Sequence, residues 1–167
     1  ALSLKLAMNL VNTSTSRVLA PHTVQNAAKM SDWLYKIVEQ DHILEKQRKP
    51  VILREIAGLS INQPIALAVQ YGALACIWRE SIYHYLNEGE SATPVTGLMQ
   101  LDTDQKPLID HWIKQYGIEC WLEKLLKKAY LPIMHILWCH GLALESHAQN
   151  MVLIHKDGLP VKAALKD

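Results

Sequence analysis

Phenylalanine is absent from this chain of 167 residues, and cysteine is scarce. The three cysteines, Cys76, Cys120 and Cys139, lie far apart, and no two of them form a C-x-x-C pair. A zinc knuckle or an iron–sulfur cluster needs grouped thiolates, so neither kind of site is supported. Scattered cysteines are typical of a reducing cytosol, where they usually act as small apolar side chains. We therefore expect a cytoplasmic protein with unpaired, mostly buried cysteines.

An excess of charge of one sign and a long apolar run are also lacking. The formal net charge is +1 and there is no basic block, so nothing indicates a nucleic-acid partner. The longest apolar stretch, PIALAVQYGALACIW, includes a glutamine and is too short to span a bilayer, so no membrane partner is expected. Polar residues interrupt the first segment, which argues against a signal peptide. The chain begins without Met and ends abruptly, so we expect a piece of a longer protein.

What is present indicates a globular α+β domain. Half of the residues are hydrophobic, and the length allows one domain with a sizeable core. Alternation over residues 2–11 predicts a half-buried strand, and the hydroxyl-rich segment 12–18 a turn. Ser31 is a good N-cap for a helix over 32–40, residues 45–50 resemble a charged loop, and Pro64 would start a long helix towards Leu86.

The second half is predicted to be helical until its last quarter. Residues 106–116 are predicted to form a short helix ended by Gly117. Residues 118–141 show a helical pattern that Pro132 should kink or break. Residues 87–94 are predicted to form a loop. The period then changes to a strand over 151–155, a turn at Asp157-Gly158 and a returning strand over 159–167. We expect this hairpin to pair with the N-terminal strand, so that several helices pack on a small antiparallel sheet.

Polar residues gather where the helical pattern gives way to the strand, in GLALESHAQN (141–150). If the helix ends near His147, Glu145 and Gln149 lie about one turn apart on the same side. Asp167 returns along the hairpin, so Glu145, Asn150 and Asp167 can converge. Such oxygen ligands suit Mg²⁺, which completes its shell with water and phosphate oxygens. Simple capping of a helix end would use the same residue types, and that alternative stays open. His135 and His140 show no ligand spacing and are expected to be packing or surface residues.

The closing segment resembles the signature of the NRPS-independent siderophore synthetases, the aerobactin-synthetase-like family. Members carry a segment like G-[IV]-A-L-E-[AS]-H-x-Q-N, an apolar strand, a D-G turn and an R-D-F-type end. Five residues match it position by position: Glu145, His147, Gln149, Asn150 and Asp167. A lysine stands before the final aspartate, where arginine is usual.

Earlier segments extend the resemblance over most of the chain. NTSTSRVL is similar to the family's T-S-x-x-R-T-type phosphate-binding turn, with Thr15 in the usual Ser place and Val18 for the usual Thr. QNAAKMSDWL resembles the next segment, in which a lysine contacts nucleotide phosphates, and Lys29 has the expected spacing from Arg17. CIWRES and NEGESATPVTGLMQ are similar to the family's central stretch.

The resemblance implies that residues 1–167 are a single-domain fragment of the palm-like catalytic domain of a larger synthetase. The full enzyme would use ATP and Mg²⁺ to activate citrate or a citrate-derived carboxylate as an acyl-adenylate. An amine or alcohol substrate would then attack to give an amide or ester, in siderophore biosynthesis for iron acquisition. A homodimer of the full-length form is left open.

The resemblance also implies a role for each site residue. Thr15, Arg17, Lys29 and Gln149 would bind ATP, whose polyanionic phosphates suit cationic partners. Glu145, Asn150 and Asp167 would hold Mg²⁺. His147 would be catalytic, in contact with the substrate carboxylate or the phosphate where charge develops.

Three alternatives remain at this point. A kinase-like phosphotransferase has a similar metal-binding part, but H-R-D, D-F-G and Gly-rich motifs are missing from this sequence. A ferric-siderophore reductase would need a cysteine-rich iron–sulfur end. The chain can also be a folded fragment without activity of its own, which would bind Mg-ATP weakly or not at all.

Overall fold

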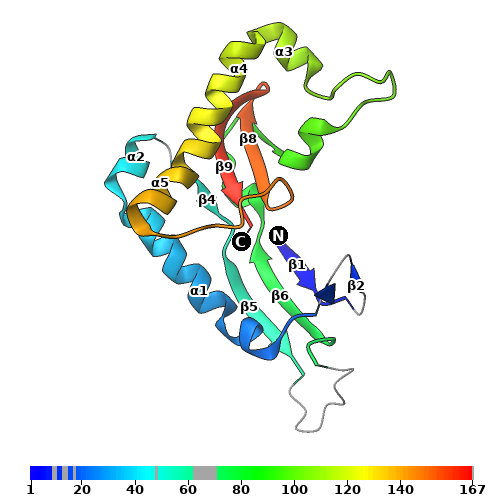
Figure 1. Cartoon of the computed structure of the whole chain (residues 1–167), viewed down its shortest axis with the longest axis vertical. Coiled ribbons are helices and arrows are strands. Elements are labelled where there is room, and N and C mark those ends of the chain that lie inside the picture. The colour runs from blue at the N-terminus through cyan, green and yellow to red at the C-terminus, as the bar shows by residue number, and fades with distance from the viewer. Residues whose placement is uncertain (9–10, 13–14, 17, 48, 62–70, 167) are drawn as a thin grey trace. The chain divides into compact units, whose positions relative to one another are not determined.

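The computed structural model describes residues 1–8, 11–12, 15–16, 18–47, 49–61 and 71–166. The chain divides into two compact units, one of residues 1–35 and 54–81 and the other of residues 36–53 and 82–167. Helix α1 (Pro21–Gln40) contributes to both (Figure 1). Each unit is described by itself.

Unit 1 contains a three-stranded antiparallel sheet in the order β1 (Leu2–Leu6), β6 (Ala75–Glu80), β5 (Glu55–Ser60). A short hairpin, β2 (Val11–Asn12) and β3 (Thr15–Ser16), precedes α1. Val24 and Ala27 of α1 pack with Ile77 of β6 in a small core. Gly58 permits this close packing, because a Cβ atom there would lie 2.5 Å from Val24 Cγ1.

Unit 2 is built on a four-stranded mixed sheet in the order β4 (Val51–Ile52), β9 (Leu159–Leu165), β8 (Met151–Lys156), β7 (Glu90–Pro94). β4 runs parallel to β9, and the other pairs are antiparallel. The turn between β8 and β9 has φ of +50° at Asp157 and +84° at Gly158, as a two-residue hairpin turn requires. The predicted hairpin is confirmed, and its strands carry fully buried Met151, Leu153, Ile154 and Leu165.

The helices of unit 2 follow the predicted breaks in its second half. They are α2 (His42–Gln47), α3 (Asp110–Tyr116), α4 (Ile118–Leu125), the π-helix η4 (Leu126–Tyr130) and α5 (Leu131–His140), with short 3₁₀ turns at η2 (Ile82–His84) and η3 (Val95–Met99). Gly117 ends α3 as expected. Pro132 lacks an N–H donor, and the wider π turn directly before α5 interrupts the regular ladder there.

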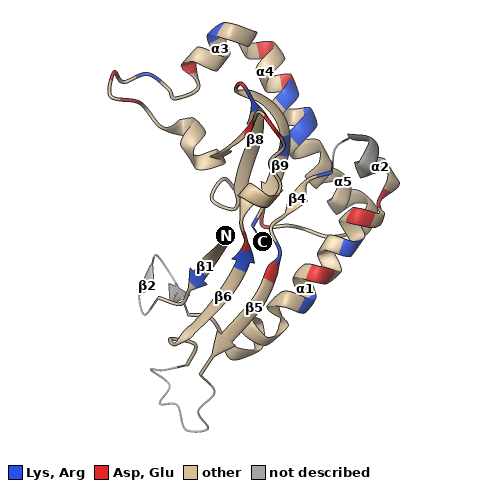
Figure 2. Ribbon diagram, turned by 180° about the vertical axis from the view of Figure 1, so that it is seen from behind, with Lys and Arg blue, Asp and Glu red and all other residues tan. Residues whose placement is uncertain are grey.

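Helix α4 and η4 pack along β9, and the charged side chains of Glu123 and Lys127 on them are exposed. Figure 2 shows these charges, among which Glu123 forms an ion pair with Lys127 one turn later. Among the described residues, no helix combines the length and the apolar character that a membrane span requires.

The predicted pairing of the N-terminal strand with the closing hairpin is wrong. β1 pairs with β6 in one sheet, whereas β8 and β9 belong to another. The sequence patterns missed the intervening partners: residues 75–80 were expected to be helical and residues 87–94 a loop. In β6, Ile77 and Arg79 are both buried, and this two-residue repeat marks a strand inside an apolar run.

Two helix boundaries also differ from the predictions. Helix α1 begins at Pro21, a residue favoured at the first helical position, and not after Ser31. The Ser31 hydroxyl instead accepts a hydrogen bond of 2.9 Å from the backbone N–H of Glu55. Helix α2 occupies part of the predicted 45–50 loop, because Asp41 caps it through the backbone N–H groups of Ile43 and Leu44. The predicted helix start at Pro64 lies outside the described residues.

The cysteines are free but less buried than expected. Cys76 is half-buried in β6, whereas Cys120 and Cys139 are exposed on helices. The prediction of unpaired thiols is confirmed and that of mostly buried ones is wrong. On α4 the neighbouring Trp121 occupies the buried side, so Cys120 faces out.

Candidate functional site

The segment 141–150, here called the closing motif, lies after helix α5 and not on it. Gly141 ends the helix in the left-handed conformation, with φ of +67°, and its N–H bonds to the carbonyl of Leu137. The prediction of a helix reaching His147 is therefore wrong. From Gly141 to Asn150 exposed and half-buried residues alternate, so Glu145, His147 and Gln149 are all exposed at a spacing of two residues.

The end of the closing motif folds back and brings three polar side chains together. The backbone N–H of Asn150 bonds to the carbonyl of His147 at 2.9 Å, which closes a tight turn. The Asn150 amide nitrogen lies 3.5 Å from Glu145 Oε2 and 3.3 Å from His147 Nε2. His147 Nε2 is 4.0 Å from the same Glu145 oxygen. Glu145, His147 and Asn150 thus form one cluster in the structure.

This cluster is open to solvent, because the side chains of Glu145 and His147 are 77% and 54% exposed. Its donor set fits a hydrated divalent cation. Half a turn of the Asn150 amide would exchange its nitrogen for its oxygen and set two oxygen ligands side by side. Cis ligands of an octahedral Mg²⁺ at roughly 2.1 Å lie about 3 Å apart, close to the observed 3.5 Å.

The end of β9 is tied to the closing motif by Lys166. Its backbone N–H bonds to the carbonyl of Asn150 at 2.9 Å, and its ammonium donates to the carbonyl of Gln149 at 3.0 Å. Asp167, the predicted third metal ligand, lies outside the described residues. The metal role of Asp167 and the nucleotide role of Gln149 stay predictions.

The other predicted ATP-binding residues belong to unit 1. Lys29 is exposed within α1, about two turns from the start of the helix, and not just before a helix cap as the sequence indicated. The backbone of Thr15 lies in β3 opposite Asn12, and its side chain is outside the described part. Arg17 also lies outside the described residues. Their contacts with ATP stay predictions.

Charged residues on β6 form structural ties within unit 1. Adjacent Arg79 and Glu80 pair separately: Arg79 Nη2 lies 3.0 Å from Glu55 Oε1, and Glu80 holds Arg54 through two contacts of 2.6 and 3.1 Å. Successive strand residues point to opposite faces, which explains why the two neighbours find different partners.

Sequence reasoning missed a second polar cluster, at Asp41, His135 and His140 in unit 2. Asp41 Oδ2 lies 2.8 Å from His135 Nε2 and 2.6 Å from His140 Nε2. Burial raises the pKa of Asp41. Hydrogen bonds from the Leu44 N–H, the two histidines and the Ile43 N–H together outweigh burial and hold this pKa well below its usual range. Asp41 is therefore a carboxylate. Its contacts span 94 and 99 residues, so local spacing could not reveal them.

Comparison with known proteins decides the family. Residues 2–100 match the model of the IucA / IucC family, which is more than half of the chain, and residues 119–167 match that of the ferric iron reductase FhuF-like transporters. The chain belongs to the IucA/IucC family.

Similar proteins match the IucA/IucC chain almost from end to end. It is 49% identical over 168 residues to a Staphylococcus aureus 2-[(L-alanin-3-ylcarbamoyl)methyl]-3-(2-aminoethylcarbamoyl)-2-hydroxypropanoate synthase. It is 47% identical over 163 residues to a Bacillus anthracis citryl-spermidine/3,4-dihydroxybenzoyl-citryl-spermidine:spermidine ligase. These matches cover 98% of this chain but only 27% and 26% of the relatives, so the chain spans about a quarter of their length.

A solved structure agrees with the sequence matches. The crystal structure of the petrobactin biosynthesis protein AsbB from Bacillus anthracis superposes with a TM-score of 0.92 at 46% identity, covering 98% of this chain and 27% of that one. The siderophore synthetase family predicted from the motifs is confirmed, and so is the α+β class with small sheets.

The FhuF-like segment holds two of the cysteines, Cys120 and Cys139, fewer than the four protein ligands of a common iron–sulfur cluster.

Proposed function

We propose that the full-length IucA/IucC enzyme containing this chain condenses a citrate-type carboxylate with an amine or alcohol at the expense of ATP, in siderophore biosynthesis. The observation that carries this proposal is the convergence of Glu145, His147 and Asn150 in a solvent-open turn. The names of the relatives support the substrate classes, since one is a citryl-spermidine:spermidine ligase.

The proposed reaction has two steps. A carboxylate oxygen of citrate attacks the α-phosphorus of ATP, the bond to the β-phosphate oxygen breaks, and pyrophosphate leaves. The nitrogen of the amine then attacks the acyl carbon, the bond to AMP breaks, and the amine releases a proton. Both steps pass through extra negative charge on oxygen, so positive or hydrogen-bonding groups fixed beside those oxygens would lower the barrier.

The closing motif would hold the metal–phosphate part of the substrate. Glu145 and Asn150 offer a carboxylate and a carboxamide to Mg²⁺, with Asp167 as the predicted third ligand. When bound, Mg²⁺ would neutralise charge on the phosphate oxygens. Tying Gln149 and Asn150 to Lys166 keeps the backbone of this turn in place, which favours a fixed ligand geometry.

The remaining residues would act on charge and position. His147 Nε2 stands at the edge of the ligand pair, where an imidazole can donate a hydrogen bond to the α-phosphate or the substrate carboxylate. Lys29, exposed on α1, would contact the triphosphate together with Arg17 and Thr15. The free cysteines support a reducing cytoplasm. A homodimer of the full-length form stays a prediction.

Product analysis tests this proposal against phosphotransfer. The full-length enzyme, incubated with ATP, Mg²⁺, citrate and a diamine, should form AMP and pyrophosphate in equal amounts. Glu145→Ala should lower both products together, while the control His22→Ala, at an exposed position on α1, should leave them unchanged. ADP together with a phosphorylated acceptor, in place of AMP and pyrophosphate, would support the kinase-like alternative and overturn the proposal.

A further inference from the structure

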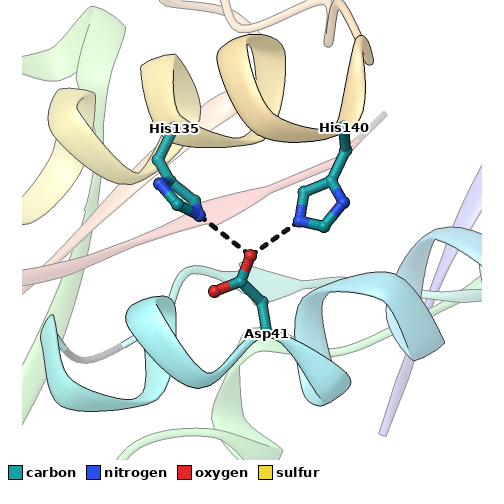
Figure 3. A group of neighbouring side chains, drawn as sticks. All are labelled: Asp41, His135 and His140. Carbon is teal, nitrogen blue, oxygen red and sulfur yellow. Dashed lines mark hydrogen bonds and ion pairs between the residues drawn. The ribbon is translucent and has the colours of Figure 1, made fainter.

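Three side chains from two separate parts of the sequence meet in unit 2. Figure 3 shows His135 and His140 reaching from α5 towards Asp41, which lies between α1 and α2. Both imidazoles present Nε2 to the same oxygen, Oδ2, at 2.8 and 2.6 Å. The three ligand atoms all lie within 4.8 Å of one another.

The two oxygens of the Asp41 carboxylate have different partners. Its Oδ1 accepts the backbone N–H groups of Ile43 and Leu44 at 2.8 and 2.9 Å, which caps α2. This fixes the orientation of the carboxylate and leaves Oδ2 for the two histidines. The side chains of Asp41, His135 and His140 are 7%, 14% and 30% exposed, so Asp41 is shielded from water while His140 lies at the surface.

The geometry points to a divalent transition-metal site. A Zn²⁺ ion binds imidazole nitrogen at about 2.0–2.1 Å and carboxylate oxygen at about 2.0–2.2 Å, so tetrahedral ligand atoms lie roughly 3.3 Å apart. The observed contacts of 2.6 and 2.8 Å need to open by about half an ångström, which small side-chain rotations supply. The ion would take the place of the two Nε2 protons that now face Oδ2.

The second nitrogen of His135 is already engaged. Cys139 Sγ lies 3.5 Å from His135 Nδ1, the ring nitrogen that does not face Asp41. When Nε2 binds a metal, Nδ1 carries the proton and can donate it to a neighbouring acceptor, here the sulfur. Cys139 is therefore a positioning residue for the imidazole and not a ligand.

We propose that Asp41, His135 and His140 form a Zn²⁺ site, separate from the Mg²⁺ site of the closing motif. Two imidazoles and one carboxylate favour zinc and similar transition metals, whereas Mg²⁺ prefers oxygen ligands. Water would complete the coordination shell. The ion would link the last turn of α5 to the residue between α1 and α2. Because His140 directly precedes Gly141, it would also fix the point from which the closing motif starts.

Zinc titration of the chelator-treated, full-length protein, without nucleotide or substrate, tests this site. The wild type should bind one Zn²⁺ per chain in competition with a chromophoric chelator. Asp41→Asn and His135→Gln should each bind at least tenfold more weakly, since each removes a ligand. Asparagine also caps helices well, so Asp41→Asn retains the fold of α2. The matched control His22→Gln should bind zinc as the wild type does.

Two further measurements keep the zinc proposal distinct from the proposed function. His147→Ala should leave zinc binding unchanged, and loss of binding in this variant would assign the zinc to the closing motif and overturn the proposal. In the wild type, Zn²⁺ should protect His135 and His140, but not His22, from a histidine-acylating reagent read out by mass spectrometry. Equal labelling with and without zinc, or no stoichiometric binding at micromolar zinc, would equally overturn it.

Discussion

The two polar clusters of unit 2 contain similar residues in opposite settings. The closing motif holds a carboxylate, a histidine and a carboxamide within six consecutive residues, and its side chains are largely exposed. The Asp41 cluster joins one carboxylate to two histidines from a distant helix and is partly buried. The short contacts of the Asp41 cluster contribute to stability even before a metal ion binds, whereas the open closing motif, with contacts of 3.3–4.0 Å, contributes little to stability. The two clusters should therefore respond differently to mutation.

The largest expected effect is on activity, at Asp167. In the full-length enzyme, Asp167→Ala should lower the rate of citrate-dependent pyrophosphate release roughly a hundredfold or more, since it removes one fixed electrostatic contact with the metal. The melting temperature should not change. The matched control is Asp104→Ala, on an exposed turn, which should keep full activity. Wild-type-like release by Asp167→Ala would remove its proposed role as a metal ligand.

Asp41→Ala, unlike Asp167→Ala, should lower the stability of the protein. It removes the cap of α2, worth about 1 kcal/mol, and the shared acceptor of two histidines, for a total of roughly 2 kcal/mol. Urea unfolding measures this change in the free energy of unfolding. Asp41→Asn, which keeps the cap, should lose clearly less. If both variants are as stable as the wild type, the buried cluster does not stabilise unit 2.

His147→Ala should separate turnover from nucleotide binding in the closing motif. We expect kcat to fall about tenfold or more, with the KM for ATP changed much less, because the proposed contact forms at the reacting centre. Steady-state kinetics of AMP formation provides the measurement. A raised KM for ATP at constant kcat would instead assign His147 to nucleotide binding.

Gly141 connects the two clusters along the chain, and its replacement should have a smaller effect. Gly141→Ala places a side chain at φ of +67°, where the left-handed conformation costs roughly 1 to 2 kcal/mol, although nothing lies within 4 Å of the added Cβ. Gly97→Ala, at a glycine without positive φ and with Thr93 at ordinary contact distance, is the control. Equal thermal stability of the two variants would show that α5 ends without help from this glycine.

His155 offers the smallest test, since it is buried and forms no ion pair with a carboxylate in the described part of the chain. Its Nδ1 accepts the Gly158 N–H at 3.1 Å, so its Nε2 carries the proton towards Thr93 Oγ1. Burial lowers the pKa of His155 below the ordinary 6.5, against a smaller opposing effect of Asp157. As pH falls through about 6.5, the unfolded chain gains a proton that the folded chain does not, so stability declines.

The pH effect can be measured by urea unfolding between pH 8 and 5. The decline should begin near the ordinary histidine pKa and level off below the lowered folded pKa. The slope of the free energy of unfolding against pH should be smaller in His155→Gln, by an amount that corresponds to the uptake of up to one proton. Identical pH profiles for the two proteins would contradict a neutral, buried His155.

The sequence by itself determined the family, the features set by nearby residues and the members of the closing motif. Asp157-Gly158 set the hairpin turn, Gly117 ended α3, and Pro132 marked the break before α5. In each case the constraint is a backbone angle or a missing N–H within one or two residues, so a short pattern contains it. The motif around Glu145 was recognised for the same reason, although its helical geometry was predicted wrongly.

Only the tertiary structure decided which strands share a sheet and which polar groups meet. β1 pairs with β6, some seventy residues away, and an alternating strand does not specify its partner. Asp41 drew no interpretation from the sequence, and only the fold places His135 and His140 of α5 against it. Such contacts depend on how amphipathic elements bury their apolar faces together. That packing is a property of the whole unit, and no local window of sequence carries it.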